Sequence, residues 1–373
     1  MLADWGADVV KVETPEGDPI RWQFPAAPGA SGSANFEFDN RGKRSVVLDY
    51  RSDVGRAALM GLIGRADIFI TNKLPGSLRR AGLDFDSLRE RFPRLIYASV
   101  TGYGLQGPAA DLAAFDIHAF WSRSGLAGQM WPEDAEPLSW RPGIGDHVSA
   151  LAAALGVVVA LYERTQSGKG QLVEGSLVRS GVYTGGFDIA EQLRRGLTIP
   201  SQRRGAPGAR ASTYYLTADR RWICIWARSL AEWRQIFGAV DRADLAEDAR
   251  FASSEAIDRN GSGLTAELES AFAAFTLGEI GRRLDAAEII WSPQLSASEV
   301  TVDEFATAAG CFVDVEDGQG GTFRAPAPPV RLAGGDGTKR PPPRVGQHTD
   351  EVLAEIGFTA DQIADARAAG AVA

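Results

Sequence analysis

The sequence is poor in the residues that build metal centres and disulfide frameworks. Its 373 residues include only two cysteines, Cys224 and Cys311, and three histidines. Neither residue type has the spacing of a zinc site, and two isolated cysteines do not make a disulfide framework. We therefore expect no bound metal, no structural disulfide and a reducing compartment, the cytoplasm.

The sequence also lacks an excess of positive charge and a long hydrophobic run. Its formal net charge is −9, which argues against nucleic-acid binding, because such proteins usually present a basic surface. The apolar stretch 148–161 is too short and too closely flanked by charge for a membrane span, and we find no signal peptide. With 45% hydrophobic and 23% charged residues, the chain resembles an ordinary soluble protein, and its length suggests two domains.

What is present in the first half is an alternation of short apolar strands and helices. We expect strands at residues 9–12, 46–48, 67–71, 95–101 and 171–177, and helices at 53–66 and 86–92. Such alternation predicts an α/β fold with a parallel, doubly wound sheet.

The pattern changes after residue 177. Residues 201–212 read as a linker, a hairpin is expected around 218–221, and helices are expected near 229–238 and 263–287. Glycine and proline are dense over 318–346, which predicts an extended return segment with a hairpin. Thr349 is expected to cap a last helix.

The most informative segment surrounds Asp146. Apolar residues follow it at helical spacing, at positions 148, 151, 155, 158 and 162. Asp146 is expected at the N-cap of this helix and Gly168 at its end. Backbone N–H groups and the helix dipole would then favour an ionised carboxylate. Taken by itself, this pattern favours an ordinary capping aspartate over a nucleophile.

Several further motifs occur in a fixed order along the chain. They are residues 2–13 (LADWGADVVKVE), 40–46 (NRGKRSV), 66–76, 102–108, 115–116, 143–147 (GIGDH) and 346–353 (GQHTDEVL). Together they resemble the family III CoA-transferases, which include formyl-CoA transferase and the carnitine and bile-acid CoA-transferases. The resemblance covers nearly the whole chain.

The resemblance implies a Rossmann-like large domain built from both ends of the chain, with a smaller α/β domain between them. On this basis we expect large-domain segments at 1–195 and 311–373 and a small domain at 196–310. It also implies an interlocked homodimer. Family members carry a strand and a helix ahead of the Ala-Asp-x-Gly-Ala-Asp motif, which begins here at Ala3. On this basis we expect either a truncated start or a member without this strand and helix.

The resemblance further implies a reaction and a set of site residues. Asp146 matches the family's nucleophile, which carries an acyl group and then coenzyme A. No cofactor is needed, since the coenzyme A thioester is a substrate and a carboxylic acid is its partner. Gly145 and His147 are expected beside the nucleophile, where backbone N–H groups could stabilise an oxyanion. The residues matching coenzyme A contacts are Leu48, Arg51, Asn72, Lys73 and Arg80, within a larger basic set that adds Arg41, Lys43, Arg44 and Arg79.

The residues at positions 115 and 116 distinguish CoA transfer from racemisation within the family. Asp116 matches an acidic residue that faces the substrate pocket, although a surface helix position is an equal alternative. The racemase branch has a histidine immediately before that acid, whereas this chain has Phe115, which cannot exchange a proton. An acyl-CoA racemase or isomerase is therefore the weaker alternative.

Two other interpretations remain open. The segment 102–107 (GYGLQG) matches G-x-G-x-x-G, but Pro108 follows and no clear helix opens there, so a nicotinamide site is disfavoured. The second is a relative that binds coenzyme A without turnover, which would follow if the first strand and its active-site loop are missing as expected.

Overall fold

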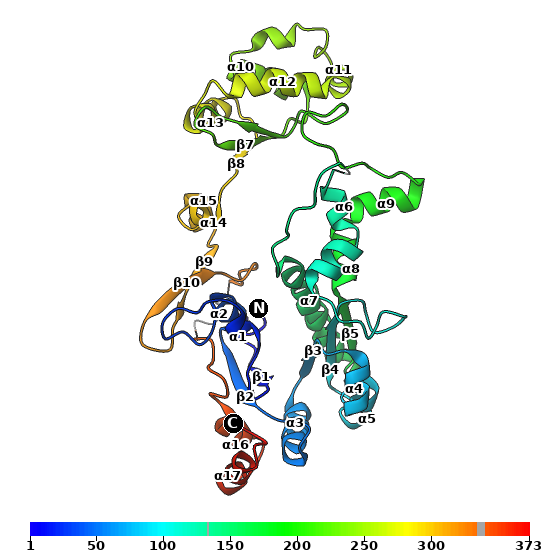
Figure 1. The fold of residues 1–373 in the computed structure, drawn as a ribbon, viewed down its shortest axis with the longest axis vertical. Coiled ribbons are helices and arrows are strands. Elements are labelled where there is room, and N and C mark those ends of the chain that lie inside the picture. The colour runs from blue at the N-terminus through cyan, green and yellow to red at the C-terminus, as the bar shows by residue number, and fades with distance from the viewer. Residues whose placement is uncertain (133, 334–339) are drawn as a thin grey trace. The chain divides into compact units, whose positions relative to one another are not determined.

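The computed structural model describes residues 1–132, 134–333 and 340–373. The chain divides into two compact units. The large unit comprises Met1–Leu126, Ser139–Ile189 and Glu304–Ala373, and the small unit comprises Ala127–Leu138 and Ala190–Asp303. The chain therefore leaves the large unit and returns to it twice (Figure 1).

The N-terminal part of the large unit alternates strands and helices as expected. Its elements are β1 (Val9–Glu13), α1 (Ile20–Gln23), α2 (Ala34–Asn40), β2 (Lys43–Val47), α3 (Asp53–Arg65), β3 (Ile68–Thr71), α4 (Pro75–Ala81), α5 (Phe85–Arg91) and β4 (Ile96–Thr101). After β4 come the π-helix η1 (Ile117–Arg123), α6 (Leu126–Met130), α7 (Ile144–Ser167), β5 (Leu172–Ser176), α8 (Leu177–Thr184) and α9 (Gly186–Arg195).

The C-terminal part of the chain returns to the large unit. It contains α15 (Glu304–Ala308), the antiparallel pair β9 (Phe312–Glu316) and β10 (Thr322–Pro326), α16 (Thr349–Glu355) and α17 (Ala360–Ala368). The hairpin predicted for the return segment is present, except that residues 334–339 lie outside the described part. Thr349 is the first residue of α16 rather than its cap, because its hydroxyl donates to the Gly346 carbonyl at 2.9 Å.

The parallel strands form two sheets rather than one. β1 pairs with β2, and β3, β4 and β5 pair in that order, all in parallel. Among the described residues no strand joins the two sheets, so the expected parallel direction is confirmed but the continuous sheet is not. β4 is the central strand of its sheet, and it is buried along most of its length, as expected for a strand covered on both faces.

One hydrophobic core joins the N-terminal elements to the last helices of the chain. Val46 and Leu48 pack in it with residues of α3, α4, α5 and β4, and α16 and α17 contribute Val352, Leu353 and Ile363. An isolated bridge between Leu48 and Val372 continues this contact through the backbone. The C-terminal helices are therefore part of the large unit's core.

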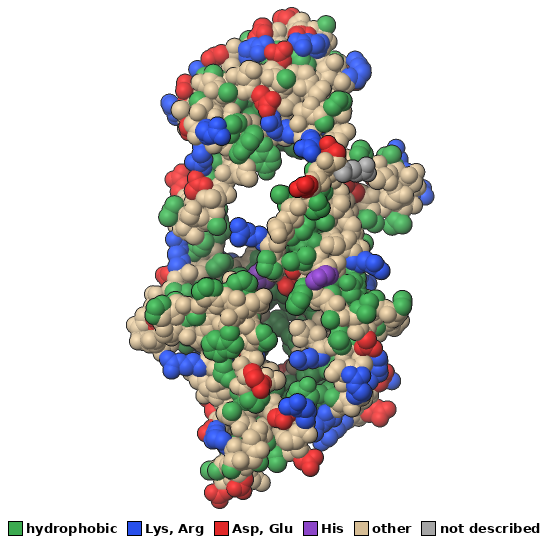
Figure 2. Space-filling model, in the orientation of Figure 1, with side chains coloured by type: hydrophobic (Ala, Val, Ile, Leu, Met, Phe, Trp, Pro, Cys, Tyr) green, Lys and Arg blue, Asp and Glu red, His purple; other side chains and the backbone are tan. Residues whose placement is uncertain are grey.

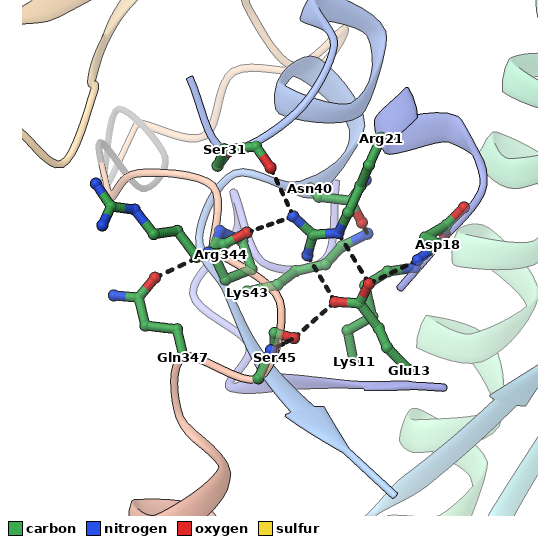
Figure 3. A network of polar contacts seen from close by, with 12 residues as sticks. Lys11, Glu13, Asp18, Arg21, Ser31, Asn40, Lys43, Ser45, Arg344 and Gln347 are labelled. Carbon is green, nitrogen blue, oxygen red and sulfur yellow. Dashed lines mark hydrogen bonds and ion pairs between the residues drawn. The ribbon is translucent and has the colours of Figure 1, made fainter. Parts of the chain in front are cut away.

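A buried polar network holds the return segment against β1 and β2 (Figure 3). The Arg21 guanidinium is fully buried and binds Glu13 at 2.6 and 2.9 Å, while its Nη1 donates to the Pro343 carbonyl at 2.8 Å. The Ser45 hydroxyl donates to the same carboxylate at 2.6 Å. Burial by itself raises the pKa of Glu13, but these hydrogen bonds outweigh it and the net pKa is lowered.

Helix α7 extends beyond the apolar run 148–161 at both ends. It has 24 residues and, by length and composition alone, is apolar enough to cross a membrane. Of its most apolar 18-residue stretch, 28% is buried inside the protein. The expectation that the run is too short for a span was therefore wrong. However, α7 packs Ala154, Val157 and Ala160 into the large unit, and a core helix meets the same criteria.

The small unit has its own core between an antiparallel sheet and several helices. The sheet has the order β6 (Tyr214–Leu216), β7 (Trp222–Ile225) and β8 (Trp291–Pro293), and the first two strands form the predicted hairpin. The helices are α10 (Leu230–Ala239), η2 (Ala243–Ala246), α11 (Ser254–Arg259), α12 (Gly261–Phe272), α13 (Leu277–Ala286) and α14 (Ala297–Val300). The single helix expected at 263–287 is two, because the Thr276 side chain caps α13.

Candidate active site

Helix α7 begins two residues before Asp146, not at it. The N-cap is Gly143, whose φ of 93° is left-handed, and Ile144 and Gly145 are already helical. Asp146 is therefore the third residue of the helix and makes no capping hydrogen bond, which corrects the N-cap expectation. Glycine tolerates this φ without a steric penalty, so the backbone fixes the helix start ahead of the aspartate.

Asp116 supplies the acceptor that an N-cap side chain would otherwise provide. Its side chain is 1% exposed, and its Oδ2 accepts the backbone N–H groups of Gly143 at 2.9 Å and Gly145 at 3.1 Å. The alternative of a surface position for Asp116 is therefore wrong. The Gly145 and His147 amides, considered above as oxyanion donors, are already engaged, since the His147 N–H donates to the Gly143 carbonyl at 2.9 Å.

The identity of residue 145 follows from close packing against η1. A Cβ added to Gly145 would lie 2.5 Å from Cγ of Phe120, which no real contact allows. Phe120 is itself almost fully buried. Glycine therefore lets the first turn of α7 approach η1 closely enough for Asp116 to reach its amides.

The Asp146 carboxylate is open to solvent and has no hydrogen-bond or ion-pair partner among the described residues. Desolvation by its surroundings raises its pKa, and the negative charge of Asp116 raises it further, whereas His147 lowers it. The net pKa lies above the usual range, contrary to the expectation from a capping position. Desolvation and the Asp116 charge therefore outweigh His147, and the amides of Gly143 and Gly145 give Asp146 no hydrogen bond because they bind Asp116.

Two residues of α2 hold the His147 side chain beside the candidate nucleophile. The His147 Nε2 lies 3.1 Å from Oδ1 of Asp39, and the Phe38 ring meets the imidazole edge-on with centroids 5.4 Å apart. The hydrogen bond with Asp39 raises the pKa of His147. Sequence reasoning missed Asp39 because it lies 108 positions from its partner and belongs to no motif.

Several aromatic residues lie near Asp116 in the sequence. Phe115 is 76% exposed, while Trp121 is buried and stacks on Trp140 with ring centroids 4.2 Å apart. The Trp121 Nε1–H has no hydrogen-bond partner within residues 1–132, 134–333 and 340–373. Of these residues, only Phe115 offers a large apolar surface to a ligand.

The predicted coenzyme A residues lie mostly at the carboxyl ends of two parallel strands. Leu48 and Arg51 follow β2, and Asn72 and Lys73 follow β3, with Arg80 on α4. Leu48 is buried and its backbone N–H donates to the Glu13 carbonyl at 3.0 Å, whereas the other four side chains are exposed. Ligands of open α/β sheets commonly bind beyond this strand end.

Arg51 forms an exposed ion pair with Asp49 at 2.8 Å, and the members of the basic set outside the predicted coenzyme A residues also have structural partners. Arg41 binds Asp4 at 2.7 Å in a buried pair, and Arg44 binds Asp8 at 2.6 Å and Glu355 at 2.7 Å. Lys43 donates to Asn40, and its burial lowers its pKa to about 8. Arg79 pairs with Asp111 at 3.2 Å. The sequence alone could not distinguish these arginines from phosphate ligands.

The glycine-rich segment 102–107 forms turns, and the next helix along the chain is η1, which begins at Ile117. The Gly104 N–H donates to the Thr101 hydroxyl at 2.9 Å, and the Leu105 N–H donates to Glu174 at 2.8 Å. A dinucleotide site would need a helix here to bind the pyrophosphate. Over the described ranges, we also find no cluster of three or more His, Cys, Asp or Glu residues that could hold a metal.

Comparison with known proteins identifies the family to which the chain belongs. The model of CoA-transferase family III matches residues 1–349, so the chain belongs to this family. It is 31% identical over 369 residues to (R)-2-hydroxy-4-methylpentanoate CoA-transferase of Clostridioides difficile, covering 97% of this chain and 92% of that protein. It is 29% identical over 371 residues to cinnamoyl-CoA:phenyllactate CoA-transferase of Clostridium sporogenes, covering 97% and 90%.

A solved structure of a related protein has a similar fold. A crystal structure of a CAIB/BAIF family protein from Brucella suis superposes with a TM-score of 0.83 at 28% identity, covering 95% of this chain and 93% of that one. The protein is a CoA-transferase with the mixed α/β fold of these neighbours. The resemblance deduced from the sequence is confirmed.

Proposed function

We propose that this enzyme moves coenzyme A from an acyl-CoA donor to a carboxylic acid acceptor, with Asp146 as the covalent nucleophile. The observation that carries the proposal is the unpartnered Asp146 carboxylate at the start of α7, in a chain of this family. A nucleophile needs free oxygen lone pairs that a substrate can reach, whereas the neighbouring Asp116 is buried and its Oδ2 accepts both helix amides. The alignment to the family's Gly-Asp motif supports the same choice.

The first half of the reaction loads coenzyme A onto the enzyme. An Asp146 oxygen attacks the acyl carbonyl of the donor, the C–S bond breaks, and coenzyme A leaves as a thiolate. The product is a mixed anhydride between Asp146 and the donor acid. The thiolate then attacks Cγ of Asp146, the anhydride C–O bond breaks, and the donor acid leaves as a carboxylate. Asp146 now carries coenzyme A as a thioester.

The second half runs the same steps in reverse with the acceptor. Its carboxylate attacks the aspartyl thioester and releases the thiolate, which then attacks the acceptor carbonyl of the new anhydride. The new acyl-CoA forms and the Asp146 carboxylate is regenerated. No redox group or metal takes part, and both intermediates must be shielded from water.

We propose that coenzyme A binds at the strand ends through Leu48, Arg51, Asn72, Lys73 and Arg80. Its 3′-phosphate and pyrophosphate favour arginine forks and lysine charges. Lys73 and Arg80 are exposed and have no ion-pair partner in the part of the chain that the structure describes. They are therefore free to bind phosphate, unlike Arg41 and Arg44.

We also propose a cytoplasmic homodimer that covers part of α7, α8 and α9. Each helix exposes large hydrophobic side chains: Leu155 on α7 is 67% exposed, Tyr183 on α8 88% and Phe187 on α9 93%. Figure 2 shows hydrophobic side chains at the surface in the region of α7 and α8. Large hydrophobic side chains exposed on neighbouring stretches of chain support an interface when they form one patch. The two free cysteines are compatible with a reducing compartment.

The test is intact-protein mass spectrometry after incubation with a panel of acyl-CoAs, with and without hydroxylamine. Hydroxylamine converts an activated aspartate to a hydroxamate, so a modification mapping to Asp146 and missing in Asp146→Ala is the expected result. Asp86→Asn, an exposed acid paired with Arg89 on α5, is the matched control and should be modified normally. Folded protein that binds coenzyme A but gains no adduct from any donor would instead indicate a non-catalytic coenzyme A-binding protein.

A further inference from the structure

The His147 side chain is held in place without being buried. Asp39 binds its Nε2 at 3.1 Å, and the Phe38 ring contacts its edge. Both partners of the ion pair remain about half exposed, at 51% for His147 and 45% for Asp39. An exposed imidazole fixed at one nitrogen can still present the other nitrogen to a ligand.

The charges around Asp146 create a need for a cation. Asp116 and Asp39 both raise the pKa of Asp146 by repulsion, and His147 is the neighbour that lowers it. The acceptor of a CoA-transferase is a further carboxylate, and it must approach the carboxylates of Asp116 and Asp39 while Asp146 carries coenzyme A as a neutral thioester. In water-excluded surroundings such repulsion is costly unless a positive charge compensates it.

The hydrogen bonds of His147 leave one donor available. Asp39, Asp146 and Asp116 are the titratable groups that face the imidazole, and each of them favours the protonated form. In an imidazolium both nitrogens are donors. Nε2–H is directed to Asp39, and no described residue accepts a hydrogen bond from Nδ1–H.

We propose that His147, oriented by Asp39, positions the carboxylate of the acceptor acid for attack on the Asp146 thioester. One acceptor oxygen binds the imidazolium while the other forms the new C–O bond at Cγ of Asp146. The C–S bond breaks and its electron pair leaves with the coenzyme A thiolate. This role rests on the proposed function, and it makes His147 the residue that selects for an anionic acceptor.

The experiment uses the exchange of an acyl-CoA with its own acid. For the acyl-CoA that labels Asp146 in the wild type, the matching isotope-labelled acid serves as acceptor, so the natural acceptor need not be known. Two quantities are measured between pH 6 and pH 9. They are the burst of Asp146–CoA adduct formed without added acid, and the KM of the labelled acid in exchange.

His147→Gln should raise the KM of the acid by roughly tenfold, as expected for loss of a charge-assisted hydrogen bond, while the adduct burst changes little. His147→Lys should restore a low KM and keep it at high pH, because its charge persists. Asp39→Asn should leave the KM low at acidic pH but raise it at a lower pH than in the wild type. Asp86→Asn is the control and should change neither quantity.

Each failure has a distinct meaning. An unchanged acid KM in His147→Gln overturns the assignment while leaving Asp146 as nucleophile. A burst that falls as much as the exchange, with no rescue by lysine, shows a structural role and also overturns it. A wild-type enzyme that forms no adduct with any donor refutes the proposed function, and this assignment fails with it.

Discussion

The buried Asp116 carboxylate accepts the backbone N–H of Gly145 at 3.1 Å and so ties the segment before η1 to the first turn of α7. This hydrogen bond lies one residue before the proposed nucleophile. It fixes the backbone that carries Asp146, and it also places a second negative charge near that side chain. Asp116 therefore influences both the position of the Asp146 backbone and the pKa of the Asp146 carboxylate.

Asp116→Asn should separate these two effects. The amide oxygen can still accept the helix N–H groups, but the negative charge is lost, so the pKa of Asp146 should fall. Because only the ionised carboxylate attacks, the acidic limb of the pH–rate profile should move to lower pH. Profiles of transfer between pH 4 and pH 8 test this. A limb that stays in place or moves upward would show that Asp116 does not set the charge of Asp146.

Asp116→Ala should instead damage the fold locally. It leaves the amides of Gly143 and Gly145 without their acceptor, at a cost of about 1–3 kcal/mol for a buried donor left unpaired. Thermal unfolding should show a lower Tm for this variant than for Asp116→Asn. Equal Tm values would mean that water or another group satisfies the helix start.

Asp146→Asn should abolish transfer with little effect on stability. The side chain is exposed and has no partner among the described residues, so its replacement removes no stabilising contact. Loss of a covalent nucleophile should lower the rate by a factor on the order of 10³ or more. Steady-state transfer assays and thermal melts of the same preparation measure both. A stable variant that retains substantial transfer would assign the chemistry to another group.

Much of this arrangement was predictable from the sequence, because it depends on local pattern. The strands, the extent of α7 to Gly168 and the resemblance around Asp146 follow from residue spacing and motif order. The start of α7 was not predictable, because the capping group is Asp116, which lies 29 positions from Gly145. The Asp39–His147 contact and the partners of Arg41 and Arg44 were missed for the same reason. Each joins segments whose proximity exists only after folding.

Arg51 and Arg44 provide a matched comparison of two arginines from one stretch of chain. Arg51 is 82% exposed in its side chain, while Arg44 is engaged by Asp8 and Glu355. Arg51→Ala should raise the KM of the acyl-CoA several-fold and leave the Tm nearly unchanged, since an exposed ion pair contributes little. Arg44→Ala should lower the Tm without changing this KM. Repeating the assay with a dephospho-CoA thioester should reduce the effect of Arg51→Ala if Arg51 binds the 3′-phosphate.

The Arg21–Glu13 pair should make the large unit sensitive to acid. Breaking a buried ion pair from one side leaves an uncompensated charge and typically costs about 3–5 kcal/mol, so Arg21→Met should be strongly destabilising.

The pKa of Glu13 is lowered in the folded state. Its contribution is therefore present above the pKa of the unfolded chain and is lost as the pH falls through the lower, folded-state value. Urea unfolding of the wild type should show declining stability over this acidic range. In Glu13→Gln, paired with Arg21→Met to remove the orphaned cation, the decline should be smaller. A double variant with an unchanged acid profile would show that other carboxylates dominate the pH dependence.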